Sequence, residues 1–258
     1  MSTWPRWERR GAPRALVQYV QRGVITGLLP DRLAAKLPGP SDEPAWERAR
    51  RIYEVFADHG ISYVHEPTSS GPAKQAIRHP GEVLSGPRQG TCLDLAVTFC
   101  GACLDAGLHP LIVALDSARG GPGHALVVVW LGEADYPWRQ AVHPTPPAEL
   151  LSQLRSSADQ PGAFLAIDVT GAAAHTPWEA VIAAGADMLA ATARGGTWRW
   201  AVAVDIGVGW HPQDVLVMPH RPLRDPLVRP YLEQDPGKDR SCSCGHGAVW
   251  SRSIPGMS

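Results

Sequence analysis

Three side chains of this sequence have the types, and follow the order, that thiol-based acyl transfer requires. Cys92 begins an expected helix, His124 begins an apolar strand, and Asp168 ends a second apolar strand. In this chemistry a thiolate attacks a carbonyl carbon, an imidazole transfers the protons, and a carboxylate orients the imidazole. The sequence therefore predicts a catalytic triad of Cys92, His124 and Asp168.

The residues around Cys92 favour its thiolate form. Gly90 permits an unusual backbone turn and Thr91 is a good N-cap, so Cys92 would lie in the first turn of the helix. Unpaired backbone N–H groups and the positive end of the helix dipole stabilise an anion at that position. An imidazolium at His124 would add to this effect, and Asp168 would accept the proton of the other ring nitrogen.

Each of these residue types, taken singly, is more often structural than catalytic, so the prediction rests on their combination. Cys100 and Cys103 fall on the apolar face of the same expected helix, and we interpret them as buried small hydrophobic residues. A structural role is likewise expected for these other histidines: His59, His65, His79, His109, His143, His175, His211 and His220.

Apolar periodicity predicts the elements that must position the three side chains. The expected helix over 92–104 is followed by a strand over 110–115, a glycine-rich connection over 117–123 and a strand over 124–131. The other expected elements are helices over 43–59, 147–154 and 178–189 and strands over 61–64, 164–169 and 198–206. At strand spacing Trp198 and Trp200 would point to one face, which favours packing in the core or a cleft over nucleic-acid stacking.

Five segments of the chain form a recognisable set: Ile77-Arg78-His79-Pro80, Gly90-Thr91-Cys92-Leu93-Asp94-Leu95-Ala96, Gly107-Leu108-His109-Pro110-Leu111-Ile112-Val113, Gly123-His124-Ala125-Leu126-Val127 and Ile167-Asp168-Val169-Thr170. Over about residues 50–206 the chain resembles bacterial transglutaminase-like proteins of the papain-like cysteine peptidase and transglutaminase superfamily. The resemblance implies an α+β fold in which a helix bearing Cys92 packs on an antiparallel β-sheet bearing His124 and Asp168. It also implies acyl transfer on amides, with Cys92 as nucleophile, His124 as base and Asp168 as the third member.

Two features depart from the family's pattern or leave it incomplete. His124 and Asp168 are 44 residues apart, which is longer than usual in the superfamily. An insertion over 132–160 must therefore loop out, and we expect it near the cleft as a lid or substrate-selecting wall. The oxyanion donor is also open: the backbone N–H of Cys92 is the first candidate, and the side chains of Gln75 and Gln89 are the others, although solvated loop glutamines would look the same.

Composition places the chain among ordinary soluble globular proteins. It has 258 residues, 44% of them hydrophobic, and a formal net charge of -1, which gives no indication of a nucleic-acid or membrane-surface partner. The longest apolar runs, Leu111–Leu115 and Ala125–Leu131, are too short to cross a bilayer. Scattered cysteines and the lack of a secretory signal pattern indicate a cytoplasmic protein.

We expect three parts along the chain: a small helical N-terminal extension over 1–45, a transglutaminase-like catalytic domain over 46–218, and a disordered C-terminal tail over 219–258. The tail contains Cys242, Cys244 and His246, which together offer at most three zinc ligands. We interpret these cysteines as incidental, and expect neither a metal nor another cofactor.

The resulting expectation is a cysteine-dependent acyl-transfer enzyme that acts on peptide or carboxamide bonds through a thioester intermediate. A peptidase with a protein or peptide substrate is the first expectation, and the triad alone does not separate hydrolysis from deamidation or transamidation. The alternative is a catalytically silent transglutaminase-like module that binds a regulatory protein partner in bacterial signalling or defence. A zinc protein built on the Cys242-Cys244-His246 cluster is a third reading.

Overall fold

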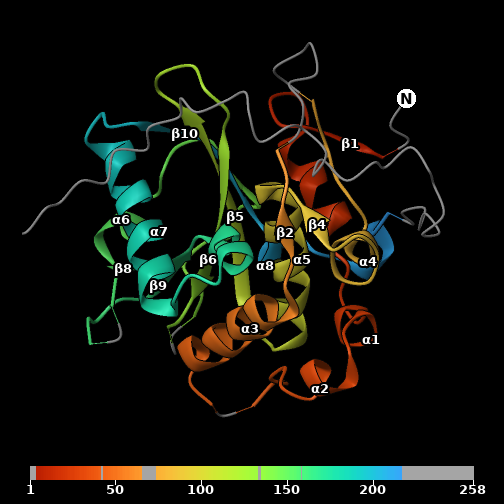
Figure 1. Ribbon diagram of the computed structural model, residues 1–258. Coiled ribbons are helices and arrows are strands. Elements are labelled where there is room, and N and C mark those ends of the chain that lie inside the picture. The colour runs from red at the N-terminus through yellow and green to blue at the C-terminus, as the bar shows by residue number, and fades with distance from the viewer. Residues whose placement is uncertain (1–3, 42, 66–73, 133–134, 158, 217–258) are drawn as a thin grey trace, which may run out of the picture. The chain divides into compact units, whose positions relative to one another are not determined.

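Figure 1 shows the computed structural model of the chain, which describes residues 4–41, 43–65, 74–132, 135–157 and 159–216. The chain divides into a unit over Met1–Leu223 and a unit over Arg224–Ser258, and every described residue belongs to the first. The tail expected over 219–258, with its Cys242-Cys244-His246 cluster, lies outside the described residues. Among the described helices, none combines the length and apolarity that a membrane crossing would need.

The described unit has an α+β fold built around a six-stranded sheet of order β7-β10-β5-β6-β9-β8. Neighbouring strands are antiparallel except β8 and β9, which are parallel. The strands are β5 (His109–Ser117), β6 (His124–Trp130), β7 (Val142–His143), β8 (Leu154–Arg155), β9 (Phe164–Ile167) and β10 (Trp198–Asp205). The strands predicted from periodicity over this part of the chain are therefore present, and they join in one sheet.

Two small sheets and several helices complete the described unit. Antiparallel β1 (Arg6–Glu8) and β3 (Lys74–Ala76) form one pair, and parallel β2 (Ser62–Tyr63) and β4 (Gln89–Gly90) form the other. The longer helices are α3 (Ala45–His59), α5 (Cys92–Asp105) and α7 (Trp178–Ala193). The short ones are η1 (Pro13–Tyr19), α1 (Ile25–Leu28), α2 (Asp31–Ala34), α4 (Pro80–Leu84), α6 (Ala148–Ser152), η2 (Val169–Ala174), α8 (Ile206–Gly209) and η3 (Pro212–Asp214).

The central strands are buried on both faces, which explains their nearly continuous apolar sequence. Ile112 and Val127 belong to the core cluster that contains α5, whereas Leu111 and Leu126 belong to a second cluster with Leu189 of α7. In Figure 1, α7 and α5 accordingly lie on opposite sides of β5 and β6. The helix α5 is itself buried from Cys92 to Leu104, as expected for a helix that is apolar all round.

The N-terminal residues pack into the core of the same unit. Leu16, Val20 and Ile25 are fully buried in the cluster that contains α5. Gly101 of α5 marks the close approach, because a Cβ there would collide with the backbone carbonyl of Gln21. The expected extension over 1–45 is thus helical in part, through η1, α1 and α2, and it covers the helix that bears Cys92.

A glycine in α7 sets how closely that helix approaches the sheet. A Cβ built at Gly185 would lie 2.6 Å from the carbonyl oxygen of Ala166 in β9. Because that oxygen belongs to the backbone of a buried strand, a side chain at 185 must push α7 away from the sheet. Close packing of α7 therefore requires the absence of a side chain at this position.

We expect Gly185→Ala to lower the free energy of unfolding by about 1–3 kcal/mol, because overpacking outweighs the gain in helix propensity. Chemical denaturation monitored by circular dichroism measures this change. Gly27→Ala in α1 is the matched control, since a Cβ there meets nothing within 4 Å, and it should be neutral or stabilising by up to about 1 kcal/mol. An equal effect of the two substitutions would contradict the packing argument.

Candidate active site

Cys92 is the first residue of α5, and the structure gives it the N-terminal position that the sequence predicts. Thr91 is the N-cap: its hydroxyl accepts the backbone N–H of Asp94 at 3.3 Å, and Asp94 Oδ2 accepts the backbone N–H of Thr91 at 2.9 Å. This reciprocal capping box fixes the turn through which the chain enters the helix. The side chain of Cys92 is 8% exposed, so its sulfur lies just beneath the surface at the positive end of a buried helix.

The turn before Cys92 is anchored by an ion pair that the sequence alone did not reveal. Asp94 is fully buried, and its carboxylate also accepts the backbone N–H of Arg78 at 2.8 Å and the Arg78 guanidinium at 2.5 Å. The guanidinium in turn lies over the ring of Trp4, 4.4 Å from its centroid. Arg78 and Asp94 both stand in the recognised segments, but only the fold shows that they pair.

His124 and Asp168 meet at one end of the sheet. β6 begins at His124, and Val127 pairs with Ile167 in the antiparallel neighbour β9, so the residue after β9 lies beside the start of β6. His124 Nε2 lies 3.1 Å from Asp168 Oδ1. The same oxygen accepts the backbone N–H and the hydroxyl of Thr170, at 3.1 Å and 2.6 Å. Three donors therefore fix this carboxylate, and through it the imidazole.

The electrostatics of the pair favour a charged imidazole. Burial lowers the pKa of His124, but hydrogen bonds with Asp168 and with the Cys92 sulfur outweigh burial and raise it to about 10. Burial raises the pKa of Asp168, whereas its bonds to His124 and Thr170 lower it further, so the net shift is downward. At neutral pH the two groups are an imidazolium and a carboxylate. Because Nε2 is committed to Asp168, Nδ1 is the nitrogen left for the sulfur.

Trp198 covers this pair from the neighbouring part of the sheet. Its ring centroid lies 5.8 Å from that of His124, with the two planes tilted by 36°. Trp198 and Trp200 both pack against the cluster that contains Leu115 and Leu126. The prediction that these two indoles share a face and pack in the core or cleft is therefore confirmed.

Of the two glutamines considered as oxyanion donors, the structure brings one to the start of α5. Gln75 of β3 has its Nε2 at 3.5 Å from the hydroxyl of Thr91, the residue before Cys92. Gln89 lies in β4, where it pairs with Ser62. The backbone N–H of Cys92 is at the open first turn of the helix, where no preceding carbonyl can accept it.

Tyr63 is a site residue that the sequence analysis missed. The parallel pairing of β2 with β4 sets Tyr63 opposite Gly90, two residues before Cys92. Burial raises the pKa of Tyr63, the charge and hydrogen bonding of the Cys92 sulfur raise it further, and the Cys92 backbone N–H opposes this by donating to the phenol oxygen. Its ring also contacts His65, with centroids 5.0 Å apart. The Tyr63 hydroxyl therefore interacts with the Cys92 sulfur, which is the proposed nucleophile, and with the Cys92 N–H, which is the first candidate oxyanion donor. The only signal in the sequence was a short alternating strand over 61–64, which does not say where that strand pairs.

The insertion over 132–160 does not lie where we expected it. β6 leads away from His124, so the insertion begins after Trp130 and ends before Phe164, which pairs with Trp130. Within the insertion, β7 pairs with Ala203 and Val204 of β10, and β8 pairs with Phe164 and Leu165 of β9. The backbone N–H of Leu131 bonds to the carbonyl of Ala163 at 2.8 Å and closes the base of the insertion. Both ends of the insertion are thus at the end of the sheet remote from His124. The expected lid or wall beside the triad is wrong in this respect, because strand direction decides where a loop emerges.

The described residues contain no group of three or more His, Cys, Asp or Glu side chains that could hold a metal ion. Cys100 and Cys103 are fully buried free thiols, as expected, and burial raises the pKa of each. The thiol at the start of α5 differs from them in having an imidazole and a phenol beside it. Comparison with known proteins adds no further evidence: no family model, no curated protein and no solved structure matches the chain.

We expect His124 to titrate near pH 10 in the folded protein, and Asp168→Asn to bring its pKa down towards the ordinary value of 6.5. Since the folded pKa lies above the unfolded one, the stabilisation is complete below about pH 6.5 and is lost as the pH rises through about 10. NMR titration of the imidazole carbon-bound protons, assigned with His124→Ala, measures the shift.

The matched control for this titration is Asp214→Asn, which removes an exposed carboxylate of η3 and should leave the His124 titration unchanged. A His124 that titrates at or below 6.5 in the unsubstituted protein would contradict the charge state inferred from the geometry.

Proposed function

We propose that this chain is a cysteine-dependent acyl-transfer enzyme, in the first instance a peptidase, with a papain/transglutaminase-like arrangement of its site. The observation that carries the proposal is the His124–Asp168 bond of 3.1 Å beside a cysteine that opens a buried helix. The pKa of His124 is raised first by Asp168 and then by the Cys92 sulfur, which supports a sulfur that lies within reach of the imidazole. A nucleophilic cysteine is activated by a helix N-terminus and by an adjacent imidazole, and Cys92 has both. A histidine with a purely structural role would need neither the thiol nor the helix terminus beside it.

The geometry supports the following sequence of bond changes. The Cys92 sulfur, its proton held on His124 Nδ1, attacks the carbonyl carbon of a peptide or carboxamide, and a sulfur–carbon bond forms. The carbonyl oxygen takes the negative charge and faces the Cys92 N–H. The carbon–nitrogen bond then breaks, and the imidazolium gives its proton to the departing amine. Water, or a second amine, loses a proton to His124 and attacks the thioester, which releases the Cys92 sulfur.

The setting that suits this chemistry is a reducing compartment. Cys92, Cys100 and Cys103 are all free, and Cys92 is close enough to the surface to be oxidised in an oxidising one. A cytoplasmic protein or peptide substrate is consistent with this reading. The proposal needs neither a metal nor another cofactor, because the Cys92 sulfur and then water or an amine supply the nucleophiles and His124 carries the protons.

One observation favours the alternative of a silent or restrained module. The Cys92 N–H and sulfur both shift the pKa of Tyr63, which places the phenol next to them, where an oxyanion would need to lie. Either the phenol moves when substrate enters, or the site does not turn over. Removal of the Tyr63 hydroxyl tests whether the phenol restrains the Cys92 sulfur or assists it, through the change in Cys92 reactivity.

We expect the protein to cleave members of a mixed peptide library in heavy-oxygen water, with the label appearing in the new carboxyl groups. Cys92→Ala should abolish cleavage, and His124→Ala should slow it at least about 100-fold, the usual contribution of general acid–base catalysis. Mass spectrometry of the products reads out the reaction. Conversion of glutamine side chains to glutamate would identify deamidation instead, and adducts with an added primary amine would identify transamidation.

His211→Ala is the matched control for the cleavage experiment, since His211 is exposed and lies outside the site. Its rate should equal that of the unsubstituted protein. If the unsubstituted protein and Cys92→Ala behave alike in every arm of the experiment, acyl transfer is rejected and the silent module is retained.

We expect Tyr63→Phe to raise the rate of Cys92 alkylation by iodoacetamide about 2- to 10-fold, the equivalent of one hydrogen bond of 0.5–1.5 kcal/mol. His124→Ala should lower the same rate, because the imidazolium that supports the thiolate is gone. Peptide mass analysis resolves Cys92 from the other cysteines. Tyr19→Phe, a buried tyrosine of η1, is the control and should change nothing. A fall in the rate with Tyr63→Phe would show that the phenol assists the sulfur rather than restraining it.

A further inference from the structure

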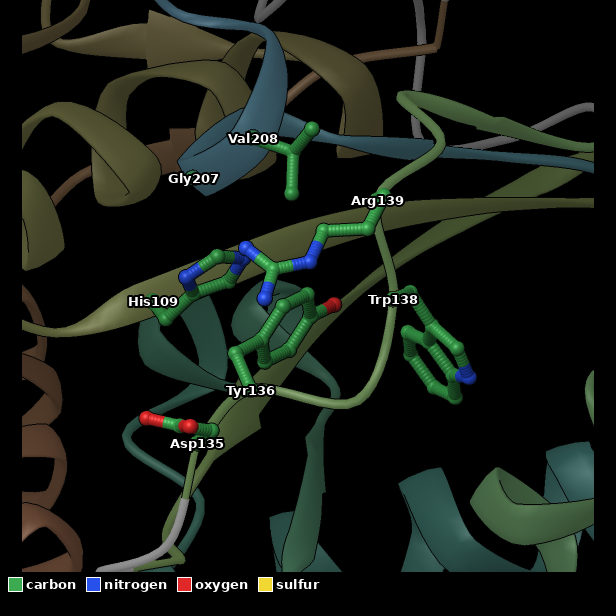
Figure 2. Close-up of a pocket in the computed structure, with 7 residues that line it drawn as sticks. All are labelled: His109, Asp135, Tyr136, Trp138, Arg139, Gly207 and Val208. Carbon is green, nitrogen blue, oxygen red and sulfur yellow. The ribbon is translucent and has the colours of Figure 1, made fainter.

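A pocket opens at the end of the sheet opposite the triad, and Figure 2 shows the residues that line it. It has a volume of about 310 Å³, and His109 and Tyr136 form its floor. His109 is the first residue of β5, whereas His124 pairs with Leu115, six residues further along that strand. At about 3.3 Å per residue the two histidines are separated by roughly 20 Å. The pocket is therefore independent of the proposed active site.

The floor of the pocket is organised by a buried carboxylate. Asp205 is fully buried, and its Oδ1 lies 2.8 Å from His109 Nε2 and accepts the backbone N–H of Val208 at 2.9 Å. The hydroxyl of Tyr136 donates to Oδ2. The rings of His109 and Tyr136 are stacked, with centroids 3.6 Å apart and planes at 25°. One carboxylate thus orients both rings and is itself saturated by three donors.

The close packing of His109 requires glycine at position 207. A Cβ on Gly207 would collide with the imidazole ring, so the backbone of α8 forms the back wall against which the ring lies flat. With Nε2 committed to Asp205, Nδ1 of His109 is the nitrogen that remains for a ligand. A histidine held this firmly at a pocket floor is pre-organised for binding.

The polar groups at the mouth favour an anion. Figure 2 shows the Arg139 side chain extending across the mouth, with its guanidinium towards His109 and Tyr136. Arg139 is exposed and, within the part of the chain that the structure describes, its guanidinium has no hydrogen bond or ion pair. Asp135 lies at the rim and is also exposed, so water screens its charge. The guanidinium is the group suited to a bidentate oxyanion.

The walls provide a place for a compact organic body. Tyr136, Trp138 and Val208 line the pocket with two aromatic rings and one aliphatic side chain. Trp138 is itself held by stacking on Phe164, with centroids 4.8 Å apart and planes at 9°. A volume near the lower end of the range for ligand sites suits a body of about one ring.

We propose that this pocket binds a small organic anion whose carboxylate or phosphate group pairs with the Arg139 guanidinium and whose body lies against His109, Tyr136 and Trp138. Four of the lining residues, Asp135, Tyr136, Trp138 and Arg139, come from the insertion over 132–160. The insertion that departs from the resembled family thus builds this site rather than a wall of the proposed active site. The proposal does not depend on acyl transfer.

The test is a titration of the full chain with benzoate, benzylamine and inorganic phosphate in turn. Binding is measured by calorimetry and by the shift of the Trp138 indole N–H resonance in NMR spectra. Trp138→Phe identifies that resonance by its loss. We expect benzoate to bind with a Kd of about 1 mM or better and to shift the Trp138 resonance, and benzylamine, which has the same body and the opposite charge, not to bind. Arg139→Gln should weaken benzoate binding at least tenfold, whereas Arg119→Gln, which removes another exposed arginine, should not.

Each outcome of the titration decides the proposal. Binding of phosphate at the same resonance, weakened in Arg139→Gln, supports the oxyanion subsite and identifies phosphate esters as the better class. Benzylamine binding as well as benzoate, or benzoate binding that Arg139→Gln leaves unchanged, overturns the anion assignment. Absence of any shift at Trp138 up to about 10 mM of all three probes overturns the site itself.

Discussion

The buried carboxylate of Asp94 is the constraint on which the geometry of the proposed active site depends. A carboxylate taken out of water costs several kcal/mol unless its partners are complete. Here it accepts the N–H groups of Thr91 and Arg78, the Thr91 hydroxyl and the Arg78 guanidinium. Such a network adds little to the free energy of unfolding, but it fixes the residue at which α5 begins. The position of the Cys92 sulfur follows from that start.

The β5–β6 hairpin carries a histidine–aspartate pair at each of its ends, and the surroundings of each pair decide what it can do. His124–Asp168 has a thiol beside it, whereas His109–Asp205 has a stacked tyrosine and a pocket. In both pairs Nε2 is committed to the carboxylate, which leaves Nδ1 for chemistry or binding. In an antiparallel sheet the start of one strand lies beside the end of its neighbour. His109 at the start of β5 therefore meets Asp205 at the end of β10, and His124 at the start of β6 meets Asp168 after the end of β9.

The sequence predicts the local parts of this structure well and the long-range parts poorly. The start of α5 follows from Thr91 and the apolar run behind it, and Gly60 ends α3 in the left-handed conformation expected of a helix stop. The helix start and stop are predicted correctly because capping is a property of neighbouring residues. His124 and Asp168 are 44 residues apart, and their pairing was anticipated from the order of residue types and from the pattern of the resembled family.

The failures concern partners chosen by the fold. Tyr63 reaches Cys92 through a two-residue parallel pairing that no periodicity reveals. The Arg78–Asp94 pair joins residues that are 16 apart in the sequence. The insertion begins and ends at the end of the sheet remote from His124, because β6 starts at His124 and leads away from it. His109 was assigned a structural role, which its bond to Asp205 supports, yet the pocket over it was invisible because its other lining residues come from distant segments.

The contacts at the Cys92 sulfur differ in how firmly they are held, and this decides how substrate can enter. The helix terminus is fixed by Asp94, and His124 is fixed by Asp168 with two further donors from Thr170. Tyr63 lies on a strand of only two residues, and the backbone bonds that hold this segment to its neighbour include Ser62 N–H to Arg88 O at 2.7 Å and Val64 N–H to Gly90 O at 3.0 Å.

Stabilising a thiolate increases its population but lowers its nucleophilicity, so only interactions that strengthen in the transition state accelerate attack. The Cys92 N–H is such a donor when it faces an oxyanion and is not when it faces a phenol oxygen. Of the three groups around the sulfur, Tyr63 is the one with the fewest fixed contacts, and its displacement by a substrate carbonyl would exchange a ground-state hydrogen bond for a transition-state one. Within the proposed mechanism, the Tyr63 hydroxyl therefore occupies the oxyanion site in the absence of substrate, and the substrate oxygen replaces it there during the reaction.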